Sequence, residues 1–467
     1  MIDNKQSVII LFFIVLFILP LPYFFRFAND NNVFMGSESH YHARMASEII
    51  QTGWVAEDPL YGRKYKPNPY HFLLAGIGLL IPVEFASIVL PVVLGLLSVL
   101  FLYLFFSSIN FKYLRSFFVL FVFIFSPMFI SVFSLSTPRA LAVFLLILGM
   151  FLFVKKSKIW LFSLLIFAVL ALIGILDLFI VLIILFMYCL HNKKNFGRFY
   201  VCFFVLFLIL IGFHLPFYFI QGISFYSSDK ILSDLGGIYG FSVFSLLLSI
   251  IGLFFVWRYK KRLYRLYLSM IMLLIVCFMF RLWLVYANIF ISILAGSAFY
   301  VLYVKKWHLR RLRGFALLVI FCGFLFAALS HAVVLSELPP NDDLVNCLEQ
   351  ASGFFPESGL FLTSAKDGFF AEFWAEKPVF VNEFSTVNVG IAETIWNSVD
   401  IRETRKLFKE NNISYILIHK DMFAGNIWDK KDQGLHFLLG NSETFKRRYH
   451  NEYCEIWKFS YNGGLNG

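Results

Sequence analysis

The chain alternates between long runs of apolar residues and shorter polar stretches. A membrane-spanning α-helix needs about 20 consecutive apolar residues, and many of the runs approach this length. The pattern therefore predicts a polytopic α-helical membrane protein with about eleven transmembrane helices. We expect these helices at residues 8–25, 85–106, 117–128, 140–154, 160–173, 178–190, 199–219, 241–257, 268–280, 282–304 and 315–335.

The positions of lysine and arginine predict the orientation of these helices. Loops rich in Lys and Arg stay on the cytoplasmic side of a membrane. The basic loops are those at residues 112–115, 155–158, 193–198, 258–265 and 305–313. Placing all of them inside puts the N-terminus in the cytoplasm. The loops at 27–69, 131–138 and 220–240 then lie outside, together with the chain after Ser336.

The C-terminal part of the chain has a different pattern. Its apolar runs are shorter and are interrupted by charged and polar residues. The segments ESGLFLTS, KPVFVNE and NISYILIHK resemble strands, and IRETRKLFKE has a helical pattern. Alternating strands and helices predict a small α/β domain. We therefore expect a transmembrane domain at 1–336, with a long first outer loop at 27–69, and an extracytoplasmic α/β domain at 337–467.

Composition supports a lipid environment and argues against nucleic acid as a partner. The 467 residues are 60% hydrophobic and 15% charged, whereas soluble domains average about 25% charged residues. The net charge of +11 comes from basic residues in short loops, where they orient helices against anionic lipid. No CxxC pair is present. Cys347 and Cys454 could pair if the C-terminal domain is outside.

The first polar loop, Gly36 to Tyr70, is the strongest candidate for function. It is long for a connection between helices, and loops of this kind usually carry function. Within it, HARMASEIIQTG fits a short amphipathic helix at the membrane interface. Five side chains that can handle protons or bind anions lie close together near its start: Glu38, His40, Tyr41, His42 and Arg44.

Each polar candidate has a functional and a structural interpretation. Glu38 could activate an acceptor or help to bind a divalent cation, or it could be a solvated acid. His42 could assist or simply pack, and Arg44 is a natural partner for phosphate. Asp58 could act in the site or start a turn before Pro59.

Three further polar residues lie near the ends of expected helices. Asp234, in ILSDLGG, could be a ligand, although a Ser-Asp pair before a helix more often caps it. Arg281 could bind phosphate or extend its charge towards the membrane surface. We expect Asp177 to be structural.

These motifs together resemble the GT-C membrane glycosyltransferases, especially the catalytic subunit of archaeal oligosaccharyltransferases. In that family an acidic residue followed by Tyr-His-x-Arg opens the first outer loop, and Asp-Pro-Leu follows. A Ser-Glu motif that assists metal binding and an arginine that contacts the lipid-linked phosphate come later. The matching positions here are Glu38 to Arg44, Asp58-Pro59-Leu60, Ser233-Asp234 and Arg281 to Val285.

The sequence also departs from the family pattern. Glu38 replaces the usual Asp, and the second outer loop, SVFSLSTPRALA, lacks the acidic DxD-type motif but offers Arg139. The WWDYG motif, which recognises the acceptor sequon, is missing, and SAKDGFFAEFW stands nearest to it. These departures put metal dependence and asparagine-linked transfer in doubt.

The resemblance implies a glycosyltransferase that moves a sugar or oligosaccharide from a polyprenyl (dolichyl) phosphate or diphosphate carrier to a protein or glycan acceptor on the outer membrane face. Glu38 and His42 would be catalytic, and Arg44, Arg139 and Arg281 would bind the donor phosphate. Glu38 and Asp234 would hold any divalent cation, Mn or Mg. His40, Tyr41 and Asp58 complete the candidates.

Two other functions are compatible with the sequence. The chain could be a non-catalytic family member that scaffolds a glycan-assembly complex, as the missing motifs allow. It could also be a flippase or transporter of lipid-linked sugars, although no inverted repeat is evident. We expect it in the plasma membrane of an archaeon or bacterium.

Overall fold

The chain forms two compact units, each built from two separate segments. The helical unit comprises Met1–Arg26 and Pro67–Leu338, and the sheet unit comprises Phe27–Lys66 and Pro339–Gly467. The structure is a computed structural model. It describes residues 4–61, 63–155, 158–216, 232–235, 237–257, 271–275, 277, 284–354, 359–385, 388–423, 425, 427–430 and 432–460.

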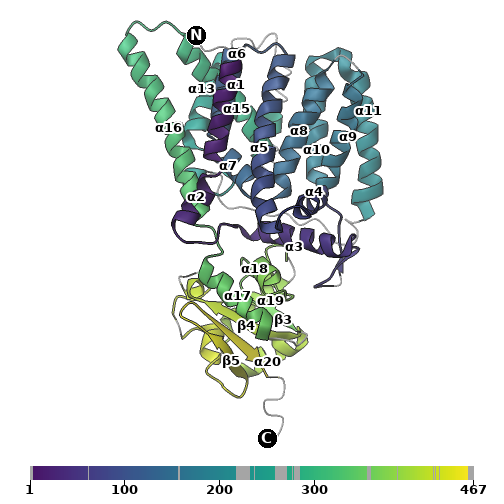
Figure 1. Ribbon diagram of the computed structural model, residues 1–467, viewed down its shortest axis with the longest axis vertical. Helices are drawn as coiled ribbons and strands as arrows, with labels where there is room; N and C mark the ends of the chain where they lie inside the picture. The colour runs from purple at the N-terminus through teal and green to yellow at the C-terminus, as the bar shows by residue number, and fades with distance from the viewer. Residues whose placement is uncertain are drawn as a thin grey trace. The chain divides into compact units, whose positions relative to one another are not determined.

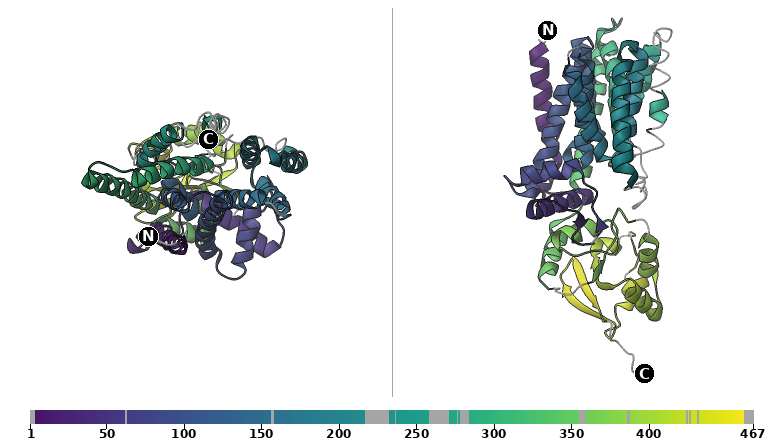
Figure 2. Two further views of the ribbon diagram at one scale, coloured as in Figure 1. Left: turned by 90° about the horizontal axis from the view of Figure 1, so that it is seen from above. Right: turned by 90° about the vertical axis from the view of Figure 1, so that its right-hand side faces the viewer.

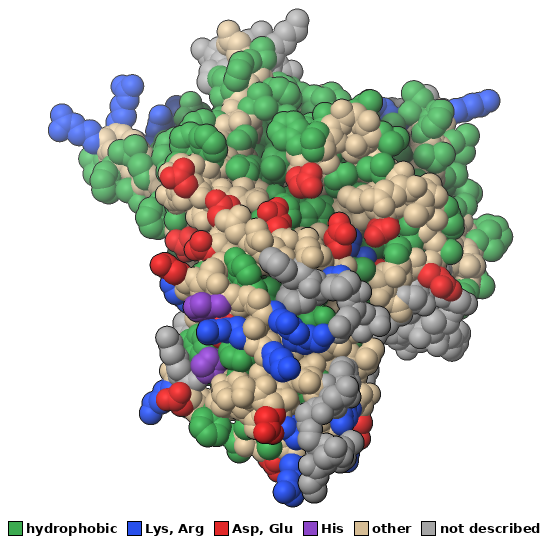
Figure 3. Space-filling model, turned by 60° about the horizontal axis from the view of Figure 1, so that its bottom comes forward, with side chains coloured by type: hydrophobic (Ala, Val, Ile, Leu, Met, Phe, Trp, Pro, Cys, Tyr) green, Lys and Arg blue, Asp and Glu red, His purple; other side chains and the backbone are tan. Residues whose placement is uncertain are grey.

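Long apolar helices that run side by side make up the helical unit (Figures 1 and 2). Apolar side chains cover much of its visible surface, whereas charged side chains are frequent on the sheet unit (Figure 3). The helices are α1 Asn4–Ile18, α2 Leu21–Ala28, α4 Pro69–Gly78, α5 Val83–Ser108, α6 Tyr113–Ile124, α7 Pro127–Ser134, α8 Pro138–Val154, α9 Trp160–Ile173, α10 Ile175–His191, α11 Phe196–Ile209, α13 Val243–Trp257, α15 Leu284–Val304 and α16 Arg310–Ser336.

The apolar helices agree with a membrane protein. Among the described residues, five helices are long and apolar enough to cross a membrane, or six if the bent pair α6 and α7 counts as one span. Four shorter apolar helices accompany them: α8, α9, α10 and the first part of α13. The expected span at 268–280 lies mostly outside the described residues. The count of eleven therefore stays a prediction.

The span expected at 117–128 is interrupted in the structure. Helix α6 ends at Ile124, and α7 begins at Pro127 with its axis bent by 64°. A proline disfavours helical backbone in the residue before it, and Ser126 is accordingly extended. The Ser126 hydroxyl then caps α7 by accepting a hydrogen bond from the Phe129 amide at 3.1 Å.

Glycines let three helices of this unit approach closely. A Cβ atom at Gly296 in α15 would lie 2.4 Å from the Val119 Cα atom of α6. A Cβ atom at Gly252 in α13 would lie 2.1 Å from the Leu294 carbonyl oxygen of α15. Helices in lipid associate through such close packing of small residues. Helix α15 is therefore held firmly between its neighbours.

The sheet unit contains a four-stranded mixed sheet in the order β3-β4-β6-β5. Strands β3 Leu360–Leu362 and β4 Ile413–His419 are parallel, and β6 Cys454–Phe459 pairs antiparallel with β4 and with β5 Phe445–His450. The helices around it are α17 Asp342–Phe354, α18 Gly368–Trp374, α19 Asn388–Asn397, α20 Ile401–Glu410 and α21 Gly434–Leu438.

Strand β4 is buried on both faces, which explains its continuous apolar run. Ile416 and Ile418 enter one hydrophobic core, while Tyr415 and Leu417 enter another on the opposite face. A disulfide joins Cys347 in α17 to Cys454 in β6. The KPVFVNE segment, expected to be a strand, contributes a single bridge between Val379 and Phe361.

The first polar loop folds as part of the sheet unit. It forms α3 Ser37–Thr52 and a small hairpin of β1 Glu57–Asp58 and β2 Arg63–Lys64. Helix α3 packs against α18, and the Gly36 amide donates to the Pro339 carbonyl at 3.0 Å. Our sequence-based division placed residues 27–69 in the transmembrane domain. The structure instead groups residues 27–66 with the C-terminal part because of these contacts.

Candidate active site

Helix α3 begins at Ser37, earlier than the amphipathic pattern indicated, and carries all five residues of the first motif. Gly36 precedes it with a φ of 87°, a conformation that favours glycine. Residues four apart lie on the same side of a helix. Glu38 and His42 are therefore neighbours on α3.

Glu38 and His42 form a carboxylate–imidazole pair. The Glu38 Oε1 and His42 Nε2 atoms are 3.5 Å apart. The His42 side chain is 5% exposed, whereas the Glu38 side chain is 22% exposed. A long contact of this kind is common in ligand-free catalytic sites. The Glu38 side chain thus keeps more access to solvent than the buried imidazole beside it.

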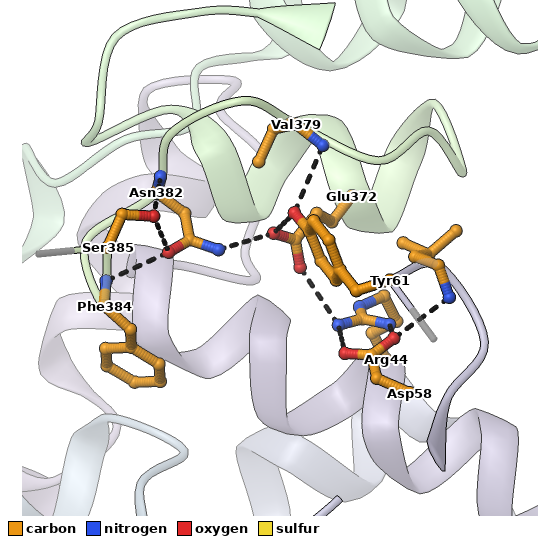
Figure 4. Close-up of polar contacts among 9 residues, drawn as sticks. Arg44, Asp58, Tyr61, Glu372, Val379, Asn382, Phe384 and Ser385 are labelled. Atoms are coloured by element: carbon orange, nitrogen blue, oxygen red, sulfur yellow. Dashed lines mark hydrogen bonds and ion pairs between the residues drawn. The ribbon is translucent and has the colours of Figure 1, made fainter. Parts of the chain in front are cut away.

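Arg44 lies in a buried ion-pair network rather than at an open surface (Figure 4). Its Nη1 and Nη2 atoms donate to the two Asp58 carboxylate oxygens at 2.9 and 2.8 Å. Its Nη2 atom also lies 3.0 Å from Glu372 Oε2. Burial lowers the pKa of Arg44, but Asp58 and Glu372 outweigh this effect and raise it above the ordinary value.

Glu372, in α18, is the centre of this network. Its Oε1 atom accepts hydrogen bonds from the Tyr61 hydroxyl at 2.6 Å and from the Asn382 amide at 2.8 Å. The Val379 amide in turn donates to the Tyr61 oxygen at 3.1 Å. Burial raises the pKa of Glu372 above its ordinary value, although the charge of Arg44 opposes this rise.

These contacts favour a structural interpretation of two predicted site residues. The Arg44 Nη atoms already face two protein carboxylates, so the contacts give the predicted phosphate-binding function of Arg44 no support. Asp58 also accepts from the Leu60 amide at 3.1 Å, which is the turn that the sequence allowed as an alternative.

His40 and Tyr41 pack among aromatic rings of the same unit. The His40 ring lies 4.1 Å from Phe34 and 4.9 Å from Phe370, measured between centroids. The Tyr41 ring lies 5.1 Å from Phe369. Burial raises the pKa of Tyr41, so its hydroxyl stays protonated at neutral pH. Both residues help to dock α3 onto α18.

Arg139 is the second residue of α8, in the helical unit. Its Nη1 atom donates to the Tyr239 hydroxyl at 3.0 Å, and its guanidinium lies 4.6 Å from the centre of that ring. Near it, the Tyr286 hydroxyl of α15 donates to Asp177 Oδ1 of α10 at 2.5 Å. A guanidinium, a carboxylate and two phenol hydroxyls of the helical unit therefore lie at or just before the first turns of α8, α10, α13 and α15.

The two remaining predicted site residues are Asp234 and Arg281. The Asp234 Oδ2 atom accepts from the Val243 amide at 2.7 Å and caps α13, as the alternative interpretation predicted. Arg281 lies outside the described residues, so its predicted contact with phosphate stays a prediction.

The described residues bring no group of three or more His, Cys, Asp or Glu side chains together as metal ligands. Glu38 faces His42, and Asp234 caps a helix, so these two predicted ligands have other partners. The described donor set by itself therefore does not fit a metal centre.

Asp367 lies in the segment that stands nearest to the missing WWDYG motif. This residue is 5% exposed and accepts a hydrogen bond from the Ser364 hydroxyl. Its Oδ2 atom also lies 2.9 Å from His419 Nε2 at the end of β4. The carboxylate is thus bound to groups of the sheet unit itself.

An apolar groove of about 360 Å³ opens on the helical unit between α1 and α16. Its lining side chains are all apolar, so the groove suits an apolar group rather than a charged one. They are Ile10, Phe13, Ile14, Phe17, Ile18, Leu21, Phe125, Leu325, Ala328 and Leu329.

Sequence reasoning missed Glu372 and the pairing of Asp177 with Tyr286. Glu372 looks like an ordinary acid in SAKDGFFAEFW, and its partner Tyr61 is 311 residues away. Asp177 did offer a signal, because ionisable residues within membrane helices are costly and suggest function. The structural role expected for Asp177 stays a prediction.

Comparison with known proteins identifies structures that share the fold of this chain. No protein-family model and no curated protein sequence matches the chain. The structure is similar to the Archaeoglobus fulgidus oligosaccharyltransferase in complex with Zn and sulfate, with a TM-score of 0.67 and 15% identity over 98% of this chain and 74% of that chain.

Two further solved structures carry lipid phosphates. AglB from Archaeoglobus fulgidus, in complex with an inhibitory peptide and a dolichol-phosphate, matches with a TM-score of 0.60 and 12% identity over 99% of this chain and 75% of that one. ArnT from Cupriavidus metallidurans, bound to undecaprenyl phosphate, matches with a TM-score of 0.56 and 15% identity over 97% of both chains. The resemblance that the first loop indicated is thereby confirmed for the fold: the chain has the fold of the GT-C membrane glycosyltransferases.

Proposed function

We propose that this membrane protein transfers a sugar or oligosaccharide from a polyprenyl phosphate or diphosphate carrier to a protein or glycan acceptor. The observation that carries the proposal is the accessible Glu38 carboxylate beside buried His42 in a chain with the GT-C fold. The lipid phosphates bound to the AglB and ArnT structures support a lipid-linked donor.

The proposed reaction exchanges one bond at the anomeric carbon. The acceptor oxygen or nitrogen forms a bond to this carbon while the bond to the phosphate oxygen breaks. Glu38 orients the acceptor and takes its proton, and His42 stabilises the carboxylate in position. The electrons of the broken bond pass to the phosphate, whose charge Arg139 and Arg281 offset.

The apolar groove between α1 and α16 is suited to part of the donor's polyprenyl chain. Its lining is entirely apolar, as a hydrocarbon chain requires. Replacing Leu329, which is half-buried in its wall, by Trp would narrow the groove. We expect weaker use of long-chain donors than of short-chain ones in this variant.

The disulfide supports an extracytoplasmic location for the sheet unit. Disulfides form in oxidising compartments and are rare in the cytosol. The bond between Cys347 and Cys454 therefore agrees with the orientation that the basic loops predicted. In the proposed orientation the N-terminus is cytoplasmic, and the membrane is the plasma membrane of an archaeon or bacterium.

Two residues bear on the acceptor and on a divalent cation, Asp367 and Glu38. Asp367 is already bound to Ser364 and His419, so it offers little support for sequon recognition. The described donor set, Glu38 included, does not fit a Mn or Mg centre, so no step of the proposed reaction depends on such an ion. Assays with and without EDTA would measure the dependence on a cation.

The decisive test compares two glutamates of the sheet unit. Purified wild-type protein in lipid nanodiscs is incubated with radiolabelled polyprenyl-phosphate sugars and candidate peptide or glycan acceptors. Glu38→Gln should lower transfer by at least about 100-fold while membrane insertion and thermal stability stay unchanged. Glu57→Gln removes an exposed acid of the same loop and should leave transfer intact.

Full transfer by the Glu38→Gln variant would remove the catalytic assignment. Absence of transfer with every donor, combined with copurification of glycan-assembly enzymes, would favour the scaffold instead. Movement of labelled lipid-linked sugar across proteoliposomes without transfer would favour a flippase.

A further inference from the structure

A histidine inside a membrane helix has no part in the site described above. His331 lies in α16 and is 3% exposed. Its Nε2 atom lies 2.6 Å from the hydroxyl oxygen of Ser131 in α7, which is fully buried. An ionisable side chain is expensive within a membrane, so a buried histidine there suggests a specific task.

The Ser131 hydroxyl connects this histidine to the segment before α13. Ser131 donates its single proton to the carbonyl oxygen of Ile238. A hydroxyl that donates there can only accept from His331, so the His331 Nε2 atom carries the proton. The pair thus holds one backbone carbonyl in a fixed place against two helices.

The segment that receives this bond is otherwise well anchored. We name it the anchored segment and define it as residues 232–235 and 237–242. The Ser233 amide donates to Phe241 at 3.2 Å, and the Gly237 amide donates to Leu232 at 3.1 Å. Asp234, near the start of the segment, accepts from the Val243 amide and caps α13 just beyond the segment's end.

Tyr239 follows directly after the held carbonyl and is the partner of Arg139. The Arg139 guanidinium both donates to the Tyr239 hydroxyl and lies over its ring. A path therefore runs from His331 through Ser131 and the Ile238 backbone to Tyr239 and Arg139. It links α16, α7 and α8 within the helical unit.

The simplest interpretation is that Ser131 satisfies a carbonyl group that lacks water. Buried carbonyl groups in membrane proteins need such partners. The His331 ring also faces the Ile238 carbonyl, so the serine and the histidine hold this one acceptor together. A histidine that fixes the orientation of the hydroxyl restricts where the next residue, Tyr239, can lie.

We propose that His331 and Ser131 are positioning residues that hold Tyr239, and through it the Arg139 guanidinium, in place for the phosphate of a lipid-linked donor. This inference rests on the proposed function for the identity of the ligand. The arrangement of the anchored segment itself can be tested without any transfer reaction.

The test uses four single variants of the full-length protein. His331→Leu and Ser131→Ala break the path. His331→Gln restores it, because the glutamine amide nitrogen can replace Nε2 as the donor. His214→Leu is the matched control, because His214 is similarly buried, at 2% exposed, and also has a contact of 2.6 Å, but to the Ala171 carbonyl.

Two measurements are made on each variant. The first is the affinity for a fluorescent polyprenyl phosphate, which should weaken by about 3–10-fold in the two path-breaking variants. The second is hydrogen–deuterium exchange of residues 237–242, which should become faster in the same two. His331→Gln and His214→Leu should match the wild type in both.

A double-variant cycle decides whether the effect passes through Arg139. In an Arg139→Met background, His331→Leu should cause little further loss of affinity. Additive losses, or an equal loss in His214→Leu, would overturn the inference. Unchanged exchange in His331→Leu would overturn it too. A wild-type protein that binds no polyprenyl phosphate would instead refute the proposed function, while the exchange data would still decide whether His331 holds the segment.

Discussion

Glu38 and Arg44 lie within two turns of each other on α3, and their surroundings differ sharply. Glu38 lies 3.5 Å from His42 and keeps part of its side chain exposed. Arg44 is buried and faces both Asp58 and Glu372. A buried cation held between two carboxylates of the same protein marks a structural group, whereas a partly exposed acid is available for chemistry. The sequence motif contains both kinds and does not distinguish them.

The largest expected effect comes from removing the buried cation. Arg44→Leu leaves Asp58 and Glu372 without their positive partner. Breaking a buried ion pair in this way costs about 3–5 kcal/mol. Thermal or denaturant unfolding of the purified protein would measure the loss. Adding Glu372→Gln should recover part of the lost stability. No recovery would contradict the ion pair between Arg44 and Glu372.

The next effect concerns transfer rather than stability. His42→Asn shortens the side chain so that it no longer reaches Glu38. We expect transfer to fall by about 100-fold and the free energy of unfolding to fall by no more than about 1 kcal/mol. His42→Gln, which can reach the carboxylate, should retain much of the rate. Large unfolding in both variants would show that His42 is mainly structural.

Tyr61→Phe should have an intermediate effect on stability. The change removes the donor to Glu372 and leaves the Val379 amide without its acceptor. Leaving a buried donor unsatisfied costs about 1–3 kcal/mol. Unfolding experiments at one pH measure this loss, and transfer by the folded variant should remain unchanged.

The smallest effect is a change of stability with pH. Glu372 has a raised pKa in the folded state, so the folded protein binds its proton more tightly than the unfolded chain does. The contribution of this group to stability is fully present below its unfolded pKa and is lost as pH rises through the folded value. Glu372→Gln removes this dependence. The stability of wild type relative to the variant should therefore decrease from acidic to neutral pH, and an increase would contradict the raised pKa.

Sequence patterns predicted those elements whose signals are local. Helix α9 occupies the expected residues 160–173, and α20 covers all of IRETRKLFKE with Asp400 as its cap. The break at Ser126 was missed, although Pro127 offered a local signal. Asp234 illustrates a correct alternative, because the pattern of a cap was visible before the structure.

Long-range pairing could not be predicted in the same way. No local pattern connects Arg44 with Glu372 or Ser131 with His331, because each pair forms only when distant helices pack. Arg44 looked like a phosphate ligand because its neighbours in sequence are polar. Its actual partners are set by tertiary contacts. The sequence could predict that Glu38 and His42 lie together, because their spacing on one helix is a local property; their function stays a prediction.

The division of the sheet unit between two distant segments has a consequence for biogenesis. Tyr61 leaves the ribosome 311 residues before its partner Glu372, which at ordinary elongation rates is roughly 15–60 s earlier. Throughout this interval α18, against which α3 packs, has not yet been synthesised. In nascent chains stalled before Glu372, α3 should consequently be accessible to proteases or chaperones. Release of the finished polypeptide should protect it.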